Sequence, residues 1–200
     1  MENKKLPLVM FIPSVGKVEL SQANFDVDFL ANIARTCKYG DNPPPKTEEQ
    51  NDNLIRSLLV SKHLSVFEFV GATFKITAPI FCARQLMRYR TGSYCEKSLR
   101  ATTVERRAED GTAYTAHYNA CVDYYNALIA EGEKKEEARR VLPLDTPTTY
   151  YFKIDGRNLL HLLEERTSKA TQWETRAIAE AMRELVKLNN RRFAEVVGLC

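Results

Sequence analysis

Apolar positions along the chain follow two kinds of repeat, one typical of strands and one typical of helices. Short runs rich in β-branched and aromatic residues predict strands over residues 8–12, 69–77 and 146–154. Strands set among longer helices indicate a single α+β domain over residues 1–200, and such a domain can complete its core by oligomerising. Apolar residues at helical spacing predict helices over residues 24–40, 47–62, 79–90, 112–131, 134–140 and 172–197, with a further helix capped by Asp155.

Local signals indicate where two of these helices begin and which face of a third is apolar. Thr47 and Gln50 have the spacing of a capping box, in which each side chain satisfies a backbone N–H of the other residue. Thr171 and Glu174 repeat that spacing ahead of the last helix. The 112–131 helix has an apolar stripe that we expect to pack against the core or an interface, and it consists of Tyr114, His117, Cys121, Tyr124 and Leu128.

The composition is that of a folded protein whose charge is unevenly placed. With 44% hydrophobic and 28% charged residues over 200 positions, the chain can bury a core without disulfides, which excludes collagen-like and disordered proteins. The formal net charge is +3, yet residues 84–107 alone carry +5 and the rest of the chain carries −2. One basic segment in a nearly neutral protein indicates one anionic partner rather than a generally adhesive surface.

The positions of cysteine, histidine and glycine exclude several classes of site. The five cysteines form no CxxC pair and Met1 to Lys5 are polar, so we expect a reduced, cytoplasmic protein without a membrane span. The three histidines lack the spacing of metal ligands, so we expect no metal site. The glycines stand too far apart to form a phosphate-binding loop. Any bound nucleotide must therefore be held mainly by side chains.

The basic segment places several reactive side chains on shared faces. Arg84 and Arg88 are four residues apart, so they share one face of the predicted helix over residues 79–90. Beyond Gly92 we expect an extended chain, in which alternate residues point the same way. Cys95 then points away from the polar row and is expected to pack. The row itself consists of Tyr94, Glu96, Ser98 and Arg100, and Lys97 and Leu99 join Cys95 on the other side.

Residues 84–100 resemble the signature of the flavin-dependent thymidylate synthases, in which an Arg-His-Arg triplet is followed after seven residues by a serine. The triplet positions hold Arg88, Tyr89 and Arg90, and the serine is Ser98. The resemblance extends over about residues 54–180 through further blocks with the family's order and spacing, namely His63 to Glu68, residues 138–143, Arg157 to His161, Arg166, and Gln172 to Glu174.

The resemblance implies a fold, a reaction and a set of partners. The fold would be α+β, with a central, mostly antiparallel sheet flanked by long helices. The reaction would be methylation at C5 of a pyrimidine deoxynucleotide, dUMP to dTMP. Methylenetetrahydrofolate would donate the carbon, and FAD recharged by NADPH would supply the hydride. The family builds its sites between subunits of a homotetramer, which would explain why one short chain carries so many separated arginines. Neither nucleic acid nor a membrane is an expected partner.

Matching positions imply roles for individual residues. C5 of uracil is a weak nucleophile, and a fixed guanidinium beside N3 and O4 would stabilise the electron-rich ring that attacks the carbon donor. The resemblance gives this catalytic role to Arg166, with Ser98 as the second catalytic residue. The positions expected to hold the nucleotide are Gln85, Arg88, Glu96, Lys97, Ser98, Leu99, Arg100, Arg139 and Arg166. The positions expected to contact the flavin are His63, Ser65, Arg88, Tyr89, Arg90, Glu96, Asp155, Arg157 and His161.

The chain departs from the family pattern mainly near the flavin positions. Tyr89 replaces the histidine of the triplet, and Cys95 and Asp155 each replace an asparagine. Two diverged reactions are therefore alternatives: release of a hydroxymethyl product by addition of water in place of hydride, or use of dCMP or UMP. An alternative of another class is a nucleic-acid-binding module, in which residues 84–107 contact phosphates and Tyr89 and Tyr94 stack on bases.

Overall fold

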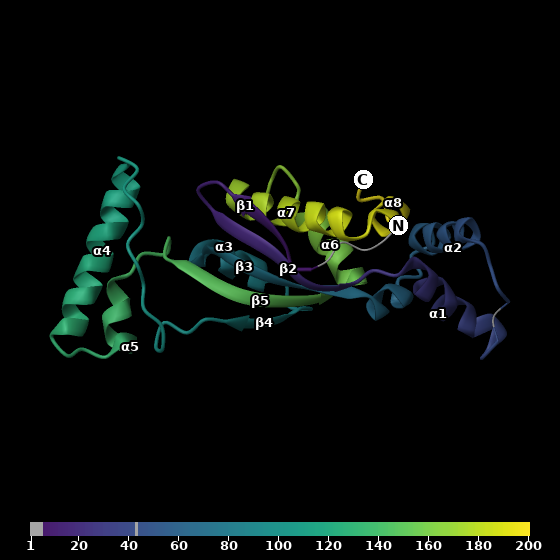
Figure 1. Cartoon of the computed structure of the whole chain (residues 1–200), viewed down its shortest axis with the longest axis horizontal. Coiled ribbons are helices and arrows are strands. Elements are labelled where there is room, and N and C mark those ends of the chain that lie inside the picture. The colour runs from purple at the N-terminus through teal and green to yellow at the C-terminus, as the bar shows by residue number, and fades with distance from the viewer. Residues whose placement is uncertain (1–5, 43) are drawn as a thin grey trace.

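The computed structural model describes residues 6–42 and 44–200, so the polar segment from Met1 to Lys5 lies outside the described residues. Five strands form one sheet in the order β1-β2-β3-β5-β4, and every neighbouring pair is antiparallel (Figure 1). The predicted α+β fold with a mostly antiparallel sheet and flanking helices is confirmed. Within the described ranges, no helix is long and apolar enough to cross a membrane.

The elements follow one another along the chain in an irregular alternation. The strands are β1 (Leu8–Ile12), β2 (Gly16–Asn24), β3 (Gly71–Pro79), β4 (Ser93–Glu96) and β5 (Pro147–Asp155). The α-helices are α1 (Val27–Tyr39), α2 (Glu48–Val60), α3 (Ile80–Met87), α4 (Ala113–Ala130), α5 (Lys135–Ala138), α6 (Gly156–Arg166), α7 (Trp173–Asn189) and α8 (Arg191–Val196). Two short 3₁₀ helices are η1 (Ser65–Phe69) and η2 (Arg139–Val141).

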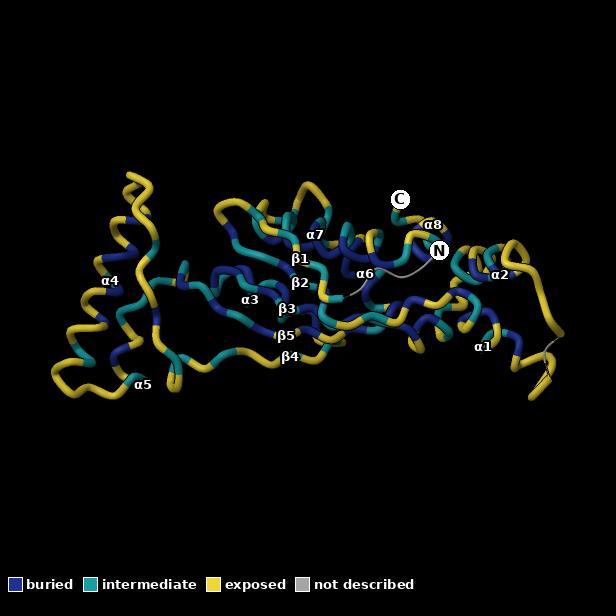
Figure 2. The backbone as a smooth tube through the Cα atoms, viewed as in Figure 1, coloured by how far each residue is buried: buried dark blue, intermediate teal, exposed yellow. Residues whose placement is uncertain are grey.

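One face of the sheet carries the main hydrophobic core. Alternate residues of β3 and β5 are buried, because successive side chains of a strand point to opposite faces (Figure 2). Phe74 and Phe152 are fully buried on the covered face, where α3, α6 and α7 pack. The opposite face carries the partly exposed Lys75 and Tyr151. The core thus fixes the positions of α3 and α6, which carry much of the candidate site.

The last predicted helix, over residues 172–197, needs one correction at its start and one near its end. Thr171 and Glu174 do not form the predicted capping box, because the Thr171 hydroxyl donates to the backbone carbonyl of Glu165 (3.1 Å). The helix is also broken at Asn190, whose side chain accepts a hydrogen bond from the backbone N–H of Phe193 (2.9 Å) and so caps α8.

The N-terminal part of the chain holds a strand that the sequence reading missed. The helix predicted from residue 24 begins at Val27, because Asn24 ends β2, and Asp26 is the residue that caps α1. The capping box of Thr47 and Gln50 at the start of α2 is confirmed.

The elements α4, α5 and η2 form an arm at one end of the sheet with an apolar cluster of its own (Figure 1). Tyr118, Val122 and Tyr125 are buried in this cluster. The stripe predicted for α4 does not lie in the core, because tyrosines occur on two neighbouring faces of the helix and the buried face is offset by one residue. Asn119 lies on the buried face, since its side chain accepts from the backbone N–H of Arg107 (2.9 Å). The residues left exposed or half-buried are Tyr114, His117, Cys121, Tyr124 and Leu128.

A network around Arg192 joins α8 to α1 and α2. The guanidinium donates two hydrogen bonds to the carboxylate of Asp28 (2.8 and 2.9 Å) and one to Asp52 (3.0 Å). The side-chain amide of Asn51 donates a further bond to Asp28 (2.6 Å). These contacts lower the pKa of Asp28, with the hydrogen bond from Arg192 as the largest cause. Arg192 therefore neutralises two carboxylates that would otherwise repel each other.

Arg192→Met is expected to destabilise the fold by about 1–2 kcal/mol, because it leaves two neighbouring carboxylates without their shared partner. A carboxylate with a lowered pKa stabilises the fold above its unfolded pKa, and that stabilisation is lost as the pH falls through its folded pKa. The cost of Arg192→Met should therefore shrink in urea titrations run below pH 4. Arg191→Met is the matched control, since among the described residues Arg191 pairs only with the exposed Glu195 and should change little. An equal loss in both variants would contradict this role.

Candidate active site

The basic residues follow the end of α3 and the turn beyond it. Arg84 lies on the exposed side of α3, Arg88 ends that helix and Arg90 lies in the turn. Gly92 lets the turn pass close to the sheet, because a Cβ at this position would collide with the ring of Phe152. All three arginines are exposed, and no ion pair in the described part of the chain neutralises them. They leave a concentrated positive charge beside α3.

Tyr89 lies in the middle of these arginines but points inward. It is only 8% exposed, and its hydroxyl lies 2.7 Å from Nδ1 of His161 on α6. The hydroxyl of Tyr94 donates to the backbone carbonyls of Tyr89 (2.7 Å) and Leu86 (3.0 Å). The ring of Tyr94 stacks on Phe152 with centroids 4.6 Å apart. The turn after α3 is therefore locked onto both the sheet and α6.

Burial decides the protonation of these phenols. It raises the pKa of Tyr89 and raises the pKa of Tyr94 to about 12, so both hydroxyls keep their protons at neutral pH. The positive charge of Arg166 opposes the rise for Tyr94. A protonated Tyr89 can donate to Nδ1 of His161, and the imidazole proton then sits on Nε2. In that tautomer, Nε2 of His161 is a hydrogen-bond donor.

A hollow of about 500 Å³ opens between the end of α3 and the start of α6. Five of the predicted flavin positions line it, and two more, His63 and Ser65, flank its wall residue Leu64 in the chain. Such a volume is within the range of small-molecule sites, ~300–1,000 Å³. The residues that line the hollow are Leu64, Arg88, Tyr89, Arg90, Thr91, Arg157, Asn158 and His161.

Two further side chains hold the rim of this hollow. Glu68 accepts a hydrogen bond from the guanidinium of Arg157 (2.6 Å). Asp155 caps α6 by accepting from the backbone N–H of Asn158 (2.9 Å) and from its side-chain amide (2.6 Å). The prediction that Asp155 caps this helix is confirmed. Glu68 lay within a recognised sequence block without being assigned a role, whereas nothing in the sequence singled out Asn158.

The row predicted beyond Gly92 forms only in part. β4 ends at Glu96, and from Ser98 the backbone turns, with the Ser98 hydroxyl accepting from the N–H of Arg100 (3.2 Å). The prediction that Ser98 and Arg100 lie in one row with Glu96 is therefore wrong. The carboxylate of Glu96 accepts from the hydroxyl of Thr148 on β5 (2.7 Å). Cys95 is exposed, so the expectation that it packs is wrong.

The turn after β4 lies against the arm. Leu99 packs on the apolar cluster of the arm, and the ammonium of Lys135 donates to the backbone carbonyl of Ala101 (3.2 Å). Arg139 lies exposed on η2 of the same arm. The predicted nucleotide positions Ser98, Leu99, Arg100 and Arg139 are therefore on or beside the arm, whereas the hollow lined by Tyr89 lies beside α6.

The last two basic residues of the 84–107 segment have structural partners. Arg106 pairs with Asp123 and Glu109, and Arg107 pairs with Asp145. The guanidinium of Arg107 also lies over the ring of Tyr118, 4.1 Å from its centroid. These two arginines attach the segment to the arm, and the unpaired charge available to a ligand comes from the arginines further upstream.

The junction of α6 and α7 brings Gln85 of α3 against α7. The Gln85 side chain accepts from the hydroxyl of the buried Thr175 (2.9 Å) and donates to the side chain of Gln172. Nε of Arg166 and Oε2 of Glu174 are buried and have no hydrogen-bond partner among the described residues. Buried polar atoms are rarely left unpaired, so these two atoms are candidates for contacts with a ligand.

Comparison with known proteins decides the family. Residues 20–189 match the family described as thymidylate synthase complementing protein. The chain belongs to the flavin-dependent thymidylate synthase family. It is 33% identical over 205 residues to the flavin-dependent thymidylate synthase of Thermus thermophilus, a match that covers 90% of this chain and 75% of the relative. The enzyme of that name from Thermosipho melanesiensis is 32% identical, with 80% of this chain and 81% of the relative covered.

A solved structure supports the same conclusion for the fold. A UMP/dUMP methylase, PolB from Streptomyces cacaoi, was crystallised with 5-Br dUMP. It superposes with a TM-score of 0.81 at 26% identity, over 96% of this chain and 95% of the methylase. The chain is therefore an enzyme of the methyltransferase class within the flavin-dependent thymidylate synthase family. This result favours the enzyme over the nucleic-acid-binding alternative.

As a flavin-dependent thymidylate synthase family member, the chain gathers its predicted site residues in separate places. The α3–α6 hollow gathers most of the predicted flavin positions, while Glu96 is held by Thr148 on β5. The nucleotide positions divide between the α6–α7 junction and the arm. Among the described residues, no three His, Cys, Asp or Glu side chains gather as a possible metal site.

Proposed function

We propose that this protein methylates C5 of dUMP, with methylenetetrahydrofolate as the carbon donor and reduced FAD as the hydride source. The observation that carries the proposal is the α3–α6 hollow, where the family's arginine triplet positions meet Arg157 and His161. The name of the Streptomyces methylase and its bound 5-Br dUMP support a uracil nucleotide as the substrate class.

The residues of the hollow fit a flavin dinucleotide. Among the described residues, the guanidiniums of Arg88 and Arg90 form no ion pair, which suits two phosphates. Nε2 of His161 can donate beside them when Tyr89 donates to Nδ1. Arg157 is held at the rim by Glu68. When bound, reduced FAD supplies the hydride that completes the methyl group. We also propose NADPH as the reductant that recharges it.

The nucleotide would be held by two groups of side chains, one at the α6–α7 junction and one on the arm. The buried, unpaired Nε of Arg166 is suited to N3 and O4 of the uracil ring, where negative charge develops as C5 attacks. Gln85, fixed by Thr175, can present its remaining N–H to the base. Arg100 and Arg139, both exposed, are suited to the phosphate.

A second candidate substrate is UMP, because the related methylase is named for both UMP and dUMP. The two nucleotides differ by a 2′-hydroxyl on the sugar. Ser98, whose own hydroxyl accepts the N–H of Arg100, lies among the nucleotide positions and can sense that difference. An assay that supplies both nucleotides together and separates their two methylated products by mass decides between them.

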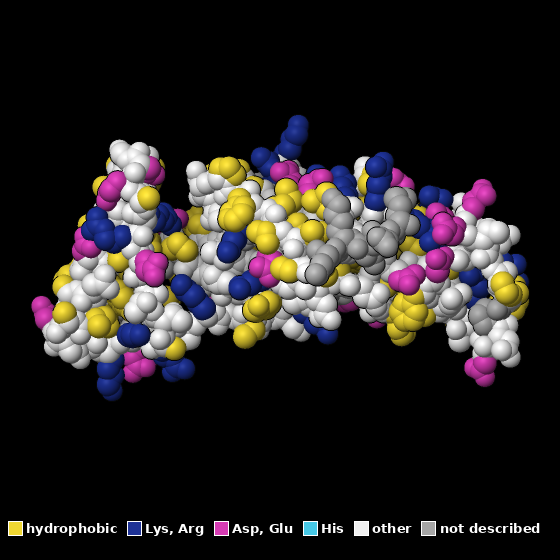
Figure 3. Space-filling model, viewed as in Figure 1, with side chains coloured by type: hydrophobic (Ala, Val, Ile, Leu, Met, Phe, Trp, Pro, Cys, Tyr) yellow, Lys and Arg dark blue, Asp and Glu magenta, His cyan; other side chains and the backbone are white. Residues whose placement is uncertain are grey.

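We further propose a homotetramer in which a neighbouring subunit completes each site. The separation of the nucleotide positions on the arm from the α3–α6 hollow supports this arrangement. The apolar side chains at the surface of α4, with Tyr114 at 84% exposure and Tyr124 at 58%, support it as well (Figure 3). All five cysteines are free, which agrees with the proposed cytoplasmic location. Light scattering at several concentrations measures the subunit number.

The experiment is a product-mass assay on the FAD-loaded protein with NADPH and methylenetetrahydrofolate. We expect dUMP to give the methylated nucleotide and the flavin absorbance to bleach and recover with turnover. UMP and dCMP are supplied in parallel, and a hydroxymethyl product is distinguished by its mass. If a folded, flavin-loaded protein makes no one-carbon product from any of the three nucleotides, the proposed function is wrong.

A further inference from the structure

Glu174 is a half-buried acid that the proposed function leaves without a role, although it lies in a recognised sequence block. It stands in the first turn of α7, and its Oε2 is buried without a hydrogen-bond partner among the described residues. An unpaired buried polar atom destabilises a fold, and a charged group does so more strongly. The carboxylate is therefore suited to a hydrogen bond from a molecule outside the chain.

A donor with the same property ends the preceding helix. Nε of Arg166, the last residue of α6, is buried and also lacks a partner among the described residues. Residues 167–172 connect the two helices, and the Thr171 hydroxyl fastens this connection to the backbone carbonyl of Glu165 (3.1 Å). Within the described ranges, no ion pair joins Arg166 to Glu174. The α6–α7 junction thus offers one donor and one acceptor that do not satisfy each other.

Gln85 of α3 adds a second donor, and its orientation is fixed. Its side-chain oxygen accepts from the hydroxyl of the buried Thr175 (2.9 Å), and one of its N–H groups donates to Gln172. Gln172 and Thr175 lie on either side of Glu174 at the start of α7. Because its oxygen is engaged, the Gln85 amide cannot turn over without losing the bond from Thr175. Its second N–H is therefore left for a ligand.

We propose that Glu174 determines the base specificity of the enzyme by accepting a hydrogen bond from N3–H of uracil, an inference that rests on the proposed function. Uracil presents an acceptor, a donor and an acceptor along one edge, namely O4, N3–H and O2. Nε of Arg166 donates to O4, Oε2 of Glu174 accepts from N3–H, and the second N–H of Gln85 donates to O2. Each group on this edge then meets a partner of the opposite kind. The bond to the carboxylate also leaves more electron density on the ring, which favours attack by C5.

The same three groups disfavour cytosine. Cytosine carries an amino group in place of O4 and an accepting nitrogen in place of N3–H. Arg166 would then face a second donor and Glu174 a second acceptor, so only the contact at O2 would remain. A buried site rejects such a base strongly, because its own polar groups stay unpaired. The junction therefore selects uracil nucleotides over dCMP, and it treats UMP and dUMP alike because they share the base.

The test is a binding titration of the FAD-loaded protein with dUMP and with dCMP, in the absence of the folate donor so that no carbon is transferred. The wild-type protein should bind dUMP at least about 100-fold more tightly than dCMP. Glu174→Gln keeps the shape of the side chain, loses its charge and gains an N–H that can donate to N3 of cytosine. This variant should bind dUMP about tenfold more weakly and dCMP more tightly, so the preference should shrink at least about tenfold.

Two further variants separate base recognition from support of the fold. Glu180→Gln makes the same change on α7 at a carboxylate that pairs with Arg176 (3.7 Å), and it should keep the wild-type preference. Thr175→Val frees the Gln85 amide to turn over and should weaken dUMP and dCMP equally, because both bases carry O2.

The ratio of the two affinities decides the outcome, since a Glu174 that only supported the fold would change both alike. An unchanged ratio in Glu174→Gln would overturn the proposal. Equal binding of dUMP and dCMP by the wild type would also overturn it, without any variant. If the wild type prefers dUMP through Glu174 yet makes no methylated nucleotide, the proposed function fails and the base recognition stands.

Discussion

Arg166→Ala is expected to lower the rate of dTMP formation by about 10²- to 10³-fold, the usual cost of removing one preorganised donor at a developing charge. Arg166 ends α6, and its buried Nε has no partner among the described residues, so its hydrogen bond is available to the substrate. Its positive charge also opposes the rise in the pKa of Tyr94. The measurement is single-turnover conversion of dUMP by the reduced enzyme.

Two variants separate a role at the base from a role in the fold. Arg166→Lys keeps the charge but not the planar donor, so we expect it to recover only a small part of the rate. Arg176→Ala, on the neighbouring helix α7, removes a half-buried arginine that pairs with Glu180 (3.7 Å) and should retain full activity. FAD affinity and thermal stability should be unchanged in all three variants. Turnover of Arg166→Ala within tenfold of the wild type would contradict the catalytic role.

Elements with strong local signals were predictable from the sequence, and those that depend on distant contacts were not. The capping box of Thr47 and Gln50 and the cap of Asp155 are satisfied within one helical turn, so their spacing was sufficient. In contrast, most of β2 was missed, because its place in the sheet depends on pairing with β3, whose residues lie far away in the sequence.

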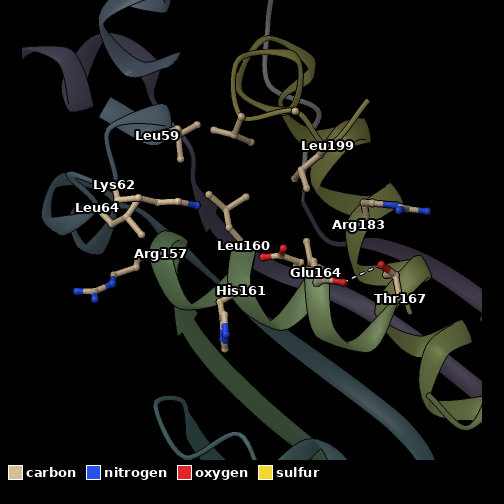
Figure 4. A pocket seen from close by; sticks show the side chains of 13 residues that line it. Leu59, Lys62, Leu64, Arg157, Leu160, His161, Glu164, Thr167, Arg183 and Leu199 are labelled. Carbon is tan, nitrogen blue, oxygen red and sulfur yellow. Dashed lines mark hydrogen bonds between the residues drawn. The ribbon is translucent and has the colours of Figure 1, made fainter. Parts of the chain in front are cut away.

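The candidate site shows the same division. Its residues were found through their spacing, because Arg88, Arg90 and Ser98 keep the order of the family signature. The geometry of these residues could not be predicted from the sequence, because the row ends after Glu96, where the backbone turns to meet the arm. A further hollow, lined by Lys62, Glu164 and Leu199, forms where α2, α6 and the C-terminal residues meet, and no local pattern encodes that contact (Figure 4).

Tyr89→Phe is expected to weaken FAD binding about 10- to 100-fold, because Tyr89 orients a side chain that faces the flavin hollow. The substitution keeps the buried ring and removes only the hydroxyl that lies 2.7 Å from Nδ1 of His161. Without that partner, the imidazole is free to rotate and to place its proton on either nitrogen. Titration of the apoprotein with FAD, followed by flavin fluorescence, measures the loss.

A double-mutant cycle shows whether Tyr89 acts through His161. His161→Ala should weaken FAD binding by itself, and adding Tyr89→Phe to it should then cost little more, because the hydroxyl has lost its partner. Tyr151→Phe, on the opposite face of the sheet, is the control and should bind FAD normally. Equal losses from Tyr89→Phe with and without His161 would show that the hydroxyl acts elsewhere.

Tyr89→His restores the family triplet. The histidine is shorter than the phenol that contacts His161, so this variant should bind FAD no better than Tyr89→Phe. Stronger binding would mean that the tyrosine weakened the site.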